Sequence, residues 1–362
     1  ELVKEAVRAG RFGPGAAVPQ DPERALAEIE PVADRTRDWL ERRWSDLPPG
    51  CRAMLAALAV TGGEPLSFAE MVRLDQHAGV DAAAADALLE SRLVRRVRTA
   101  GGELGLALTA PALAGLVVER TPRPELRTLH RRRAEVLAGL AGAEAQRGRH
   151  LLAAGEPAAA VELLGEAAAR SFEGGLARET IRLVDEALAA GAVLPPPRRE
   201  GRLRRLRASA LAAAGHTADA EAEFVRALAA ARGERDPQEL AESLRISGRF
   251  RGERGDQAQG LADLEEALAL LDDLGDVAGG ARVLLDLGRL LERLGRADDA
   301  EARLASALNQ ARRSGRPDLE ADALVALGEI AARRGRAEQA GELFRSAEAA
   351  AGGAPAALRS AA

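Results

Sequence analysis

Histidine and cysteine are the residue types in this chain that could bind a metal ion or act as a nucleophile, and they are few. The four histidines and the single cysteine are His77, His130, His150, His216 and Cys51. A zinc site takes several such ligands, usually at short spacings on helices or turns. These five residues show no such spacing, so each histidine is interpreted as a helix-end or packing residue and no metal site is predicted.

Two other constellations could support catalysis. Cys51 follows Gly50 at the start of a predicted helix, where a helix dipole could lower the pKa of a thiol. No histidine lies close to it in the sequence, so we interpret the thiol as structural. Adjacent carboxylates such as Glu265 and Glu266 could act as an acid and a base, but 30% of the residues are charged, and solvated helix faces explain these pairs.

Nucleotide chemistry would require a phosphate-binding loop. The pattern Gly-x-x-x-x-Gly-Lys followed by Ser or Thr, whose backbone amides hold phosphates, does not occur in the sequence. Gly10, Gly13 and Gly15 form a glycine-rich stretch, but it contains Pro14, lacks the lysine and is interpreted as a linker. No catalytic residue and no cofactor site is predicted, and we do not expect this segment to be an enzyme.

Composition indicates that helices must position whatever site the chain has. Alanine, leucine, arginine and glutamate dominate, aromatic residues make up 2%, and tyrosine is absent, which favours helix over strand. The single cysteine excludes an internal disulfide and favours a cytoplasmic location. No apolar run approaches the roughly 20 residues of a membrane span, and a net charge of −5 gives no global signal for nucleic-acid binding.

A 40-residue repeat runs along the second half of the chain. Its most regular feature is a series of glycines, namely Gly175, Gly215, Gly255, Gly295 and Gly335. Each is followed by alanine, glycine or threonine after five positions, by a larger apolar residue after nine and by an alanine after twelve. This is the pattern of a helical hairpin with a glycine turn. One such hairpin cannot bury its own apolar face, so the segment predicts a stacked α-solenoid.

The repeat resembles the tetratricopeptide repeat in a version with longer helices. Gly248, Gly288 and Gly328, each seven residues before a turn glycine, match the family's small position where two helices cross closely. Ala168 and Ala208 replace that glycine in the earlier units and keep the position small. The resemblance predicts tetratricopeptide-like hairpins over 158–352, with 353–362 as the start of a truncated further repeat or a tail.

A different module is predicted over 21–108. After a helix over 31–44, the pattern indicates helices over 52–60, 67–74 and 81–89, with Ser67 and Asp81 as caps. Two short strands, 93–97 and 104–108, enclose a glycine-containing turn, and no other β structure is expected. Three helices followed by a two-stranded wing predict a winged helix. The expected fold class is therefore all-α, with one small β-wing before the solenoid.

A winged helix can bind DNA through its third helix, so the charges of that helix decide the interpretation. The segment 81–90 carries Asp81, Asp86 and Glu90 and has no arginine, lysine, asparagine or glutamine. Such a surface cannot read base edges, and its charges oppose phosphate. The arginines of the wing could touch a DNA backbone, yet a packing module without sequence-specific DNA binding is the preferred interpretation.

The segment between these modules carries a more specific resemblance. Leu126 to Glu135, followed by His150 to Pro157 and Ala160 to Leu164, resembles the connector of bacterial signal-transduction ATPases with numerous domains, the STAND class. The resemblance implies a connector over 109–157 and the end of an ATPase lid plus a linker over 1–20. Related architectures are linked to kinases, cyclases and LuxR-type regulators. Family members commonly have a histidine after the wing, where this chain has Leu108 to Pro111.

The tetratricopeptide resemblance also implies a binding groove lined by the first helix of each hairpin. Carried over position by position, the groove includes Arg202, Arg205, Arg245, Arg249, Arg282 and Arg289. Rows of arginine suit carboxylate or phosphate partners because a guanidinium group forms paired hydrogen bonds with them. The alternative is that arginine is simply common in this chain.

Together these features predict a regulatory or sensor arm of a multidomain signalling ATPase. Its repeats would bind a protein or peptide, with an acidic one among the options, or a small ligand. Its winged helix would contact an ATPase core further upstream, where ATP is expected. Two alternatives stay open: the interaction part of a LuxR-type transcription regulator, and a passive tetratricopeptide scaffold.

Overall fold

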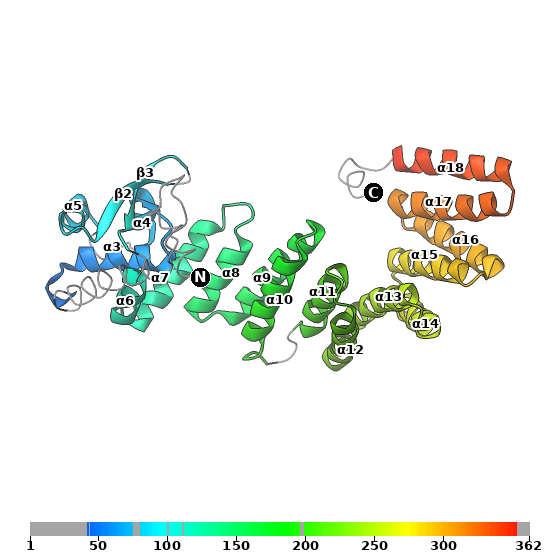
Figure 1. Cartoon of the computed structure of the whole chain (residues 1–362), viewed down its shortest axis with the longest axis horizontal. Coiled ribbons are helices and arrows are strands. Elements are labelled where there is room, and N and C mark those ends of the chain that lie inside the picture. Colours follow the sequence, from blue (N-terminus) through cyan, green and yellow to red (C-terminus); the bar gives the residue numbers. More distant parts are fainter. Residues whose placement is uncertain are drawn as a thin grey trace, which may run out of the picture. The chain divides into compact units, whose positions relative to one another are not determined.

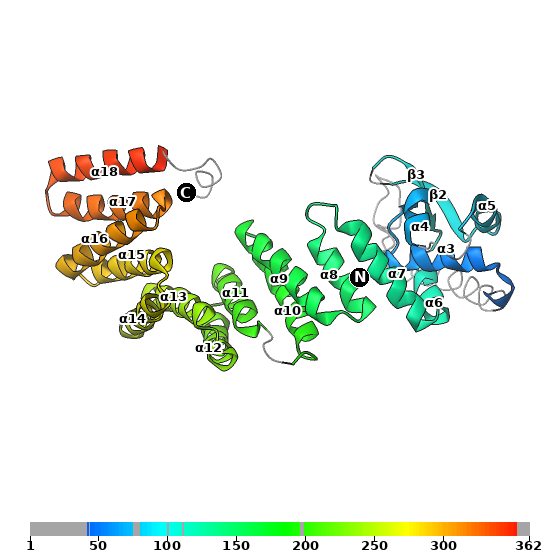
Figure 2. The ribbon, with the colours of Figure 1, turned by 180° about the vertical axis from the view of Figure 1, so that it is seen from behind.

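A computed structural model of the chain describes residues 42, 44–74, 80–99, 101–110, 112–195 and 199–352 (Figures 1 and 2). The chain forms two compact units, Glu1–Leu164 and Gly165–Ala362, and the boundary between them falls within helix α9 (Pro157–Glu173). The segments expected to form the lid (1–20), most of the helix over 31–44 and the tail over 353–362 lie outside the described residues.

Helix α3 (Pro49–Val60) is the centre of the first unit. Its residues from Gly50 to Val60 are buried, apart from Arg52. A helix that is apolar on all sides is stable only when other elements cover every face, and here helices and a strand surround it. The helices of this unit are η1 (Trp44–Asp46), α4 (Phe68–Leu74), α5 (Ala82–Glu90), α6 (Ala112–Arg120), α7 (Arg123–Leu137) and α8 (Glu144–Ala154).

The two predicted caps are confirmed. The Asp81 carboxylate accepts a hydrogen bond from the backbone N–H of Ala84 (2.8 Å) and thereby caps α5. Ser67 and Glu70 form a reciprocal capping box at the start of α4. The N–H of Ser67 donates to Glu70 Oε2 (2.9 Å), and the N–H of Glu70 donates to Ser67 Oγ (3.3 Å).

A small antiparallel sheet has the strand order β1-β3-β2. Its strands are β1 (Leu66–Ser67), β2 (Val94–Arg98) and β3 (Leu104–Leu108). Strands β2 and β3 are the predicted pair, with Arg96 opposite Leu106. The expectation of no further β structure is wrong, since β1 pairs with β3. Gly105 makes this possible, because a Cβ at this position would lie 2.5 Å from the Leu66 carbonyl oxygen.

The second unit is an array of helical hairpins, and the predicted stacking of at least four antiparallel pairs is confirmed. The pairs are α11 with α12, α13 with α14, α15 with α16, and α17 with α18, and each packs on the next. Figure 1 shows this succession from green to red. The helices are α10 (Ala177–Gly191), α11 (Glu200–Ala213), α12 (Thr217–Glu234), α13 (Pro237–Arg254), α14 (Gln257–Leu274), α15 (Val277–Arg293), α16 (Ala297–Arg313), α17 (Pro317–Arg333) and α18 (Ala337–Gly352).

The 40-residue register sets the geometry of each hairpin. All five turn glycines adopt left-handed conformations, with φ between 73° and 97°, which other residues adopt at a cost. The larger apolar residue of the pattern is at most 1% exposed at Phe224, Leu264 and Leu304, whereas Phe344 on α18 is 38% exposed. At Gly288 a Cβ would lie 2.5 Å from Leu304 Cγ, so this glycine permits the close crossing of α15 and α16.

The first helices of successive hairpins also contact one another: α11 contacts α13, α13 contacts α15, and α15 contacts α17. We call the surface formed by α11, α13, α15, α17 and the residues of α9 beyond Gly165 the first-helix face. Within the described residues, no helix is both long enough and apolar enough to cross a membrane.

Candidate binding site

The first-helix face is hollowed between α9, α11 and α13. The cavity has a volume of about 720 Å³ and is also bordered by residues of α12. Its larger apolar lining residues are Phe172, Leu206, Phe224, Ile246 and Phe250. The rings of Phe224 and Phe250 lie with their centroids 5.2 Å apart at an angle of 43°, which is within the range of favourable aromatic pairs. The cavity therefore has an apolar floor.

The repeat register explains why the floor lies in this part of the array. The position nine residues before the turn glycine is Leu206 in one repeat and Ile246 in the next, but Asp286 in the repeat after that. These residues lie at equivalent places on α11, α13 and α15. At this position the first-helix face is thus apolar on α11 and α13 and has a carboxylate on α15.

Charged residues surround this floor. The arginines that line the cavity are Arg202, Arg205, Arg249 and Arg254, and the glutamates are Glu173, Glu242 and Glu253. Arg202 and Arg254 are exposed and form no hydrogen bond or ion pair within the part of the chain that the structure describes. Arg249 has one weak ion pair, at 4.0 Å, with Glu253 on its own helix.

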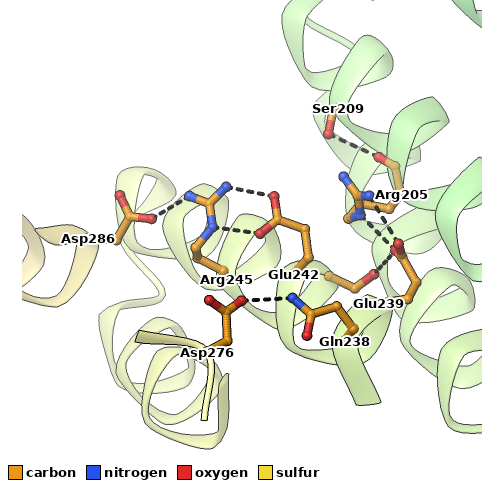
Figure 3. A network of polar contacts seen from close by, with 9 residues as sticks. Arg205, Ser209, Gln238, Glu239, Glu242, Arg245, Asp276 and Asp286 are labelled. Carbon is orange, nitrogen blue, oxygen red and sulfur yellow. Dashed lines mark hydrogen bonds and ion pairs between the residues drawn. The ribbon is translucent and has the colours of Figure 1, made fainter. Parts of the chain in front are cut away.

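Arg205 is held differently (Figure 3). Its Nε and Nη2 donate to the two carboxylate oxygens of Glu239 on α13, at 2.7 and 3.1 Å. Glu239 also accepts a hydrogen bond from the Ser243 hydroxyl (2.8 Å). The side chains of Arg205 and Glu239 are only 18% and 11% exposed. This pair links α11 to α13 and leaves few donors of Arg205 for a ligand.

Arg245 makes the equivalent connection one repeat later. It lies ten residues before its turn glycine, as Arg205 does. Its guanidinium group donates twice to Glu242 (2.9 and 2.8 Å) and once to Asp286 on α15 (2.7 Å), as Figure 3 shows. Burial alone would raise the pKa of Glu242, but the hydrogen bonds and charge of Arg245, with the charges of Arg205 and Arg282, lower it.

The six arginines predicted for the groove therefore do not form one set. Arg202, Arg205 and Arg249 line the cavity, whereas Arg245, Arg282 and Arg289 do not. Arg282 acts electrostatically on Glu242 and Asp276. Arg289 acts on Asp322, although burial still raises the pKa of Asp322 above its usual value. A role of these residues in binding stays a prediction.

Sequence reasoning missed the phenylalanine floor and the acidic partners Glu239 and Asp286. Phe172 and Phe250 lie three and five residues before their turn glycines, so they are not equivalent positions and no repeat pattern relates them. The available signal was the large apolar pair Leu206 and Ile246, at a position where the other repeats have Glu166, Asp286 and Ala326.

Other polar clusters of the repeats are structural. Arg251 on α13 donates to Asp263 on α14 (2.6 Å) and to Glu221 on α12 (2.7 and 2.8 Å), and its side chain is 10% exposed. The carboxylate of Glu223, 1% exposed, accepts from Arg204, Arg207 and other donors. These contacts fix neighbouring helices and offer no surface to a ligand.

Two histidines without any metal-ligand spacing in the sequence lie together in the first unit. Nδ1 of His130 on α7 and Nδ1 of His150 on α8 are 2.9 Å apart, a hydrogen-bond distance. Burial, followed by the positive charges of His130 and Arg133, lowers the pKa of His150 to about 4. Among the described residues, no three histidine, cysteine, aspartate or glutamate side chains converge as a metal site requires.

Cys51 is a packing residue in the described structure. It is 1% exposed, and its thiol donates to the Ala84 carbonyl oxygen (3.6 Å). Burial raises the pKa of this thiol, and the charge of Asp81 raises it further. This direction is opposite to the lowering that a helix dipole could cause, and it fits the interpretation of the thiol as structural.

Part of the repeat array matches a known family. Residues 281–352 match the tetratricopeptide repeat. This segment covers most of α15 and all of α16, α17 and α18. Comparison with curated protein sequences gives no match.

Solved structures show a similar fold. BtubC (BKLC) from P. vanneervenii is 20% identical, covering 60% of this chain and 90% of that chain, with a TM-score of 0.52. A signal transduction ATPase with numerous domains (STAND) with a tetratricopeptide repeat sensor, from Pyrococcus horikoshii, is 14% identical over 87% of this chain and 52% of that chain (TM-score 0.47). A Rap protein complexed with competence and sporulation factor is 12% identical over 70% and 82% (TM-score 0.45).

Proposed function

We propose that this chain is a non-catalytic recognition arm whose first-helix face binds a peptide or an extended segment of a protein. The observation that carries the proposal is the cavity between α9, α11 and α13, where an apolar floor and arginines without partners among the described residues open on one surface. Apolar lining with a few polar groups is typical of binding sites. Tetratricopeptide arrays commonly offer such extended surfaces to partners.

We further propose that the arm belongs to a cytoplasmic signalling ATPase of the STAND class. The connector-like sequence from Leu126 to Leu164 supports this assignment. In this proposal, α3, α4, α5 and the small sheet form a winged helix that packs on an ATPase core. Helix α5 is acidic, and its Asp86 pairs with Arg96 at 3.6 Å. This charge favours a role in packing against another domain over sequence-specific DNA binding. Ligand binding to the repeats would then shift the equilibrium between inactive and active states of that ATPase.

The upstream gene sequence tests the ATPase assignment. A phosphate-binding loop encoded before Glu1, followed by a helical lid, is the expected result. An upstream reading frame without such a loop would leave the assignment without its catalytic domain and refute it.

Peptide phage display on the full chain tests the binding function. We expect a random peptide library to yield enriched sequences that the wild type binds and that Ser209→Trp binds at least about tenfold more weakly, a loss of about 1.4 kcal/mol. Ser209 lines the cavity, and its hydroxyl donates only to the carbonyl oxygen of Arg205 in its own helix, so tryptophan fills the cavity without removing a tertiary contact.

Ser306→Trp is the matched control. The Ser306 hydroxyl likewise donates to a carbonyl oxygen four residues earlier, that of Ala302, and Ser306 lies on α16 outside the cavity. This variant should keep wild-type binding. Failure to enrich any peptide, or equal binding by the Ser209 variant, would refute the proposed function.

A further inference from the structure

We propose that the cavity recognises a peptide in which a large apolar side chain is adjacent to a carboxylate. The apolar side chain would occupy the phenylalanine floor, and the carboxylate would pair with Arg202 and Arg249 on the rim. This inference rests on the proposed function and adds the chemistry of the ligand.

The distribution of aromatic residues supports the apolar half of this specificity. The chain has six phenylalanines, and three of them, Phe172, Phe224 and Phe250, line this one cavity. Phe224 is buried and serves the core, but Phe172 and Phe250 are only partly buried, as are Leu206 and Ile246. These side chains keep apolar surface in contact with water, and a ligand side chain that covers it gains hydrophobic free energy.

The ion pairs of the first-helix face support the second part of the proposal, which is that the ligand carries a carboxylate. Arg205 donates through two N–H groups to Glu239, and Glu242 accepts two hydrogen bonds from Arg245, so these lining residues have less free hydrogen-bonding capacity for a ligand. The guanidinium groups of Arg202 and Arg254 have no partner within the described residues, and that of Arg249 has one contact at 4.0 Å. Their free donors fit a carboxylate, which accepts paired hydrogen bonds from guanidinium groups.

A polyanion such as nucleic acid fits this surface poorly. Glu173 and Glu253 share the rim with the arginines, and Asp322 lies further along the first-helix face, on α17. A chain of phosphates along the face would meet these carboxylates. One or two carboxylates beside an apolar side chain can pair with the arginines without lying along the whole face.

Fluorescence anisotropy with the full chain tests this inference. The probe is a fluorescein-labelled, N-acetylated hexapeptide with one phenylalanine between two aspartates and with glycines elsewhere. Two matched peptides replace either both aspartates by asparagine or the phenylalanine by alanine. We expect the probe to bind about tenfold more tightly than either matched peptide, because each change removes one half of the recognition.

The variant R202E/R249E should abolish the preference for aspartate over asparagine while keeping the preference for phenylalanine over alanine. The control R303E/R313E changes two arginines of α16, outside the cavity, and should keep both preferences. Equal binding of the three peptides, or an aspartate preference that survives R202E/R249E, would refute the proposed chemistry. Competition by a duplex DNA oligonucleotide at physiological salt would refute the choice of a peptide ligand.

These outcomes are distinguishable from a failure of the proposed function. If phage display enriches peptides that depend on the cavity but lack an acidic residue next to an apolar one, the chemistry proposed here is wrong and the binding function stands. If no peptide is enriched, the function itself fails.

Discussion

Arginine has two separate roles on the first-helix face. Arg205 and Arg245 occupy equivalent positions and each reaches an acidic residue of the next first helix, Glu239 and Asp286 respectively. Two donors of Arg205 and three of Arg245 are used within the protein. Arg202 and Arg249 lie on the same helices but are exposed, so their donors are available to a partner. The same residue type therefore stabilises the array at one position and offers a binding group at another.

Replacing Arg245 tests the structural role. In Arg245→Leu, the carboxylates of Glu242 and Asp286 lose their shared cation, and Asp286 is only 6% exposed. We expect the free energy of unfolding to fall by about 3 kcal/mol, the cost typical of breaking a buried ion pair. Arg249→Leu is the control, since its exposed ion pair should contribute about 1 kcal/mol or less. Urea unfolding followed by circular dichroism measures both, and equal small losses would contradict the assignment.

The pair of His130 and His150 makes the first unit sensitive to pH. The pKa of His150 is lowered to about 4 by burial and then by the charges of His130 and Arg133, whereas in the unfolded chain it is about 6.5. Between these values the unfolded state binds more protons than the folded state, so stability falls as the pH falls. The contribution is complete above about pH 6.5 and is lost progressively toward pH 4.

His150→Gln should reduce this pH dependence. We expect the variant to lose less stability than the wild type between pH 7 and pH 5, by on the order of 1 kcal/mol after allowing for partial exposure. Trp44 packs against the core of the first unit, and the sequence of the second unit contains no tryptophan, so urea unfolding followed by tryptophan fluorescence reports on the first unit. His216→Gln in the second unit is the control. An unchanged difference between the two pH values in the His150 variant would contradict the account.

At the scale of elements, the hairpins depend on glycines for two different reasons. The turn glycines supply left-handed backbone conformations, whereas Gly288 supplies space, because α16 lies against its Cα. Alanine at Gly288 would place its Cβ 2.5 Å from Leu304 Cγ. The clash outweighs the better helix propensity of alanine, which is worth up to about 1 kcal/mol.

Two glycine substitutions should thus change the stability of the repeat array in opposite directions. We expect Gly288→Ala to destabilise the repeat array by about 1–3 kcal/mol through overpacking. Gly341→Ala on α18 should stabilise it by about 0.5–1 kcal/mol, because nothing lies within 4 Å of the added Cβ. Thermal unfolding followed by circular dichroism distinguishes the two. Stabilisation by both substitutions would mean that α15 and α16 do not cross closely at Gly288.

Features with a local cause could be predicted from the sequence, and features made by distant residues could not. The turn at Gly255 follows from one residue type at a fixed spacing, and the cap at Asp81 needs only the following helix. Strand β1 has two residues, too few for an alternating pattern, and it depends on Gly105 far along the chain. The pairing of Arg205 with Glu239 joins residues 34 positions apart, a choice that only the packing of α11 on α13 makes.

Only part of the candidate site could be predicted from the sequence, namely the arginines and not the apolar floor. Resemblance to a repeat family placed Arg202, Arg205 and Arg249 on first helices, and they line one cavity. It did not distinguish Arg205, which pairs with Glu239, from Arg202, because both are arginines on the same helix. The floor was not predictable, since Phe172, Phe224 and Phe250 come from three helices and converge only when the hairpins stack.

At the scale of the whole molecule, the repeat array provides a surface whose character changes along its length. At α11 and α13 it combines an apolar cavity with exposed arginines, whereas at α15 and α17 it carries Asp286 and Asp322 together with Arg282 and Arg289. With a net charge of −5, the chain as a whole repels anionic partners weakly. An anionic segment is therefore directed to one part of the array, which gives a partner both a place and an orientation.

Photo-crosslinking tests this central claim most directly. In the acidic hexapeptide probe, benzoylphenylalanine replaces phenylalanine, and after irradiation with the full chain the modified residues are identified by mass spectrometry. The account predicts labels at residues that line the cavity, such as Leu206, Ile246 and Phe250, and loss of these labels in Ser209→Trp. Labels confined to the outer helices α14 and α16, or to the unit Glu1–Leu164, would contradict it.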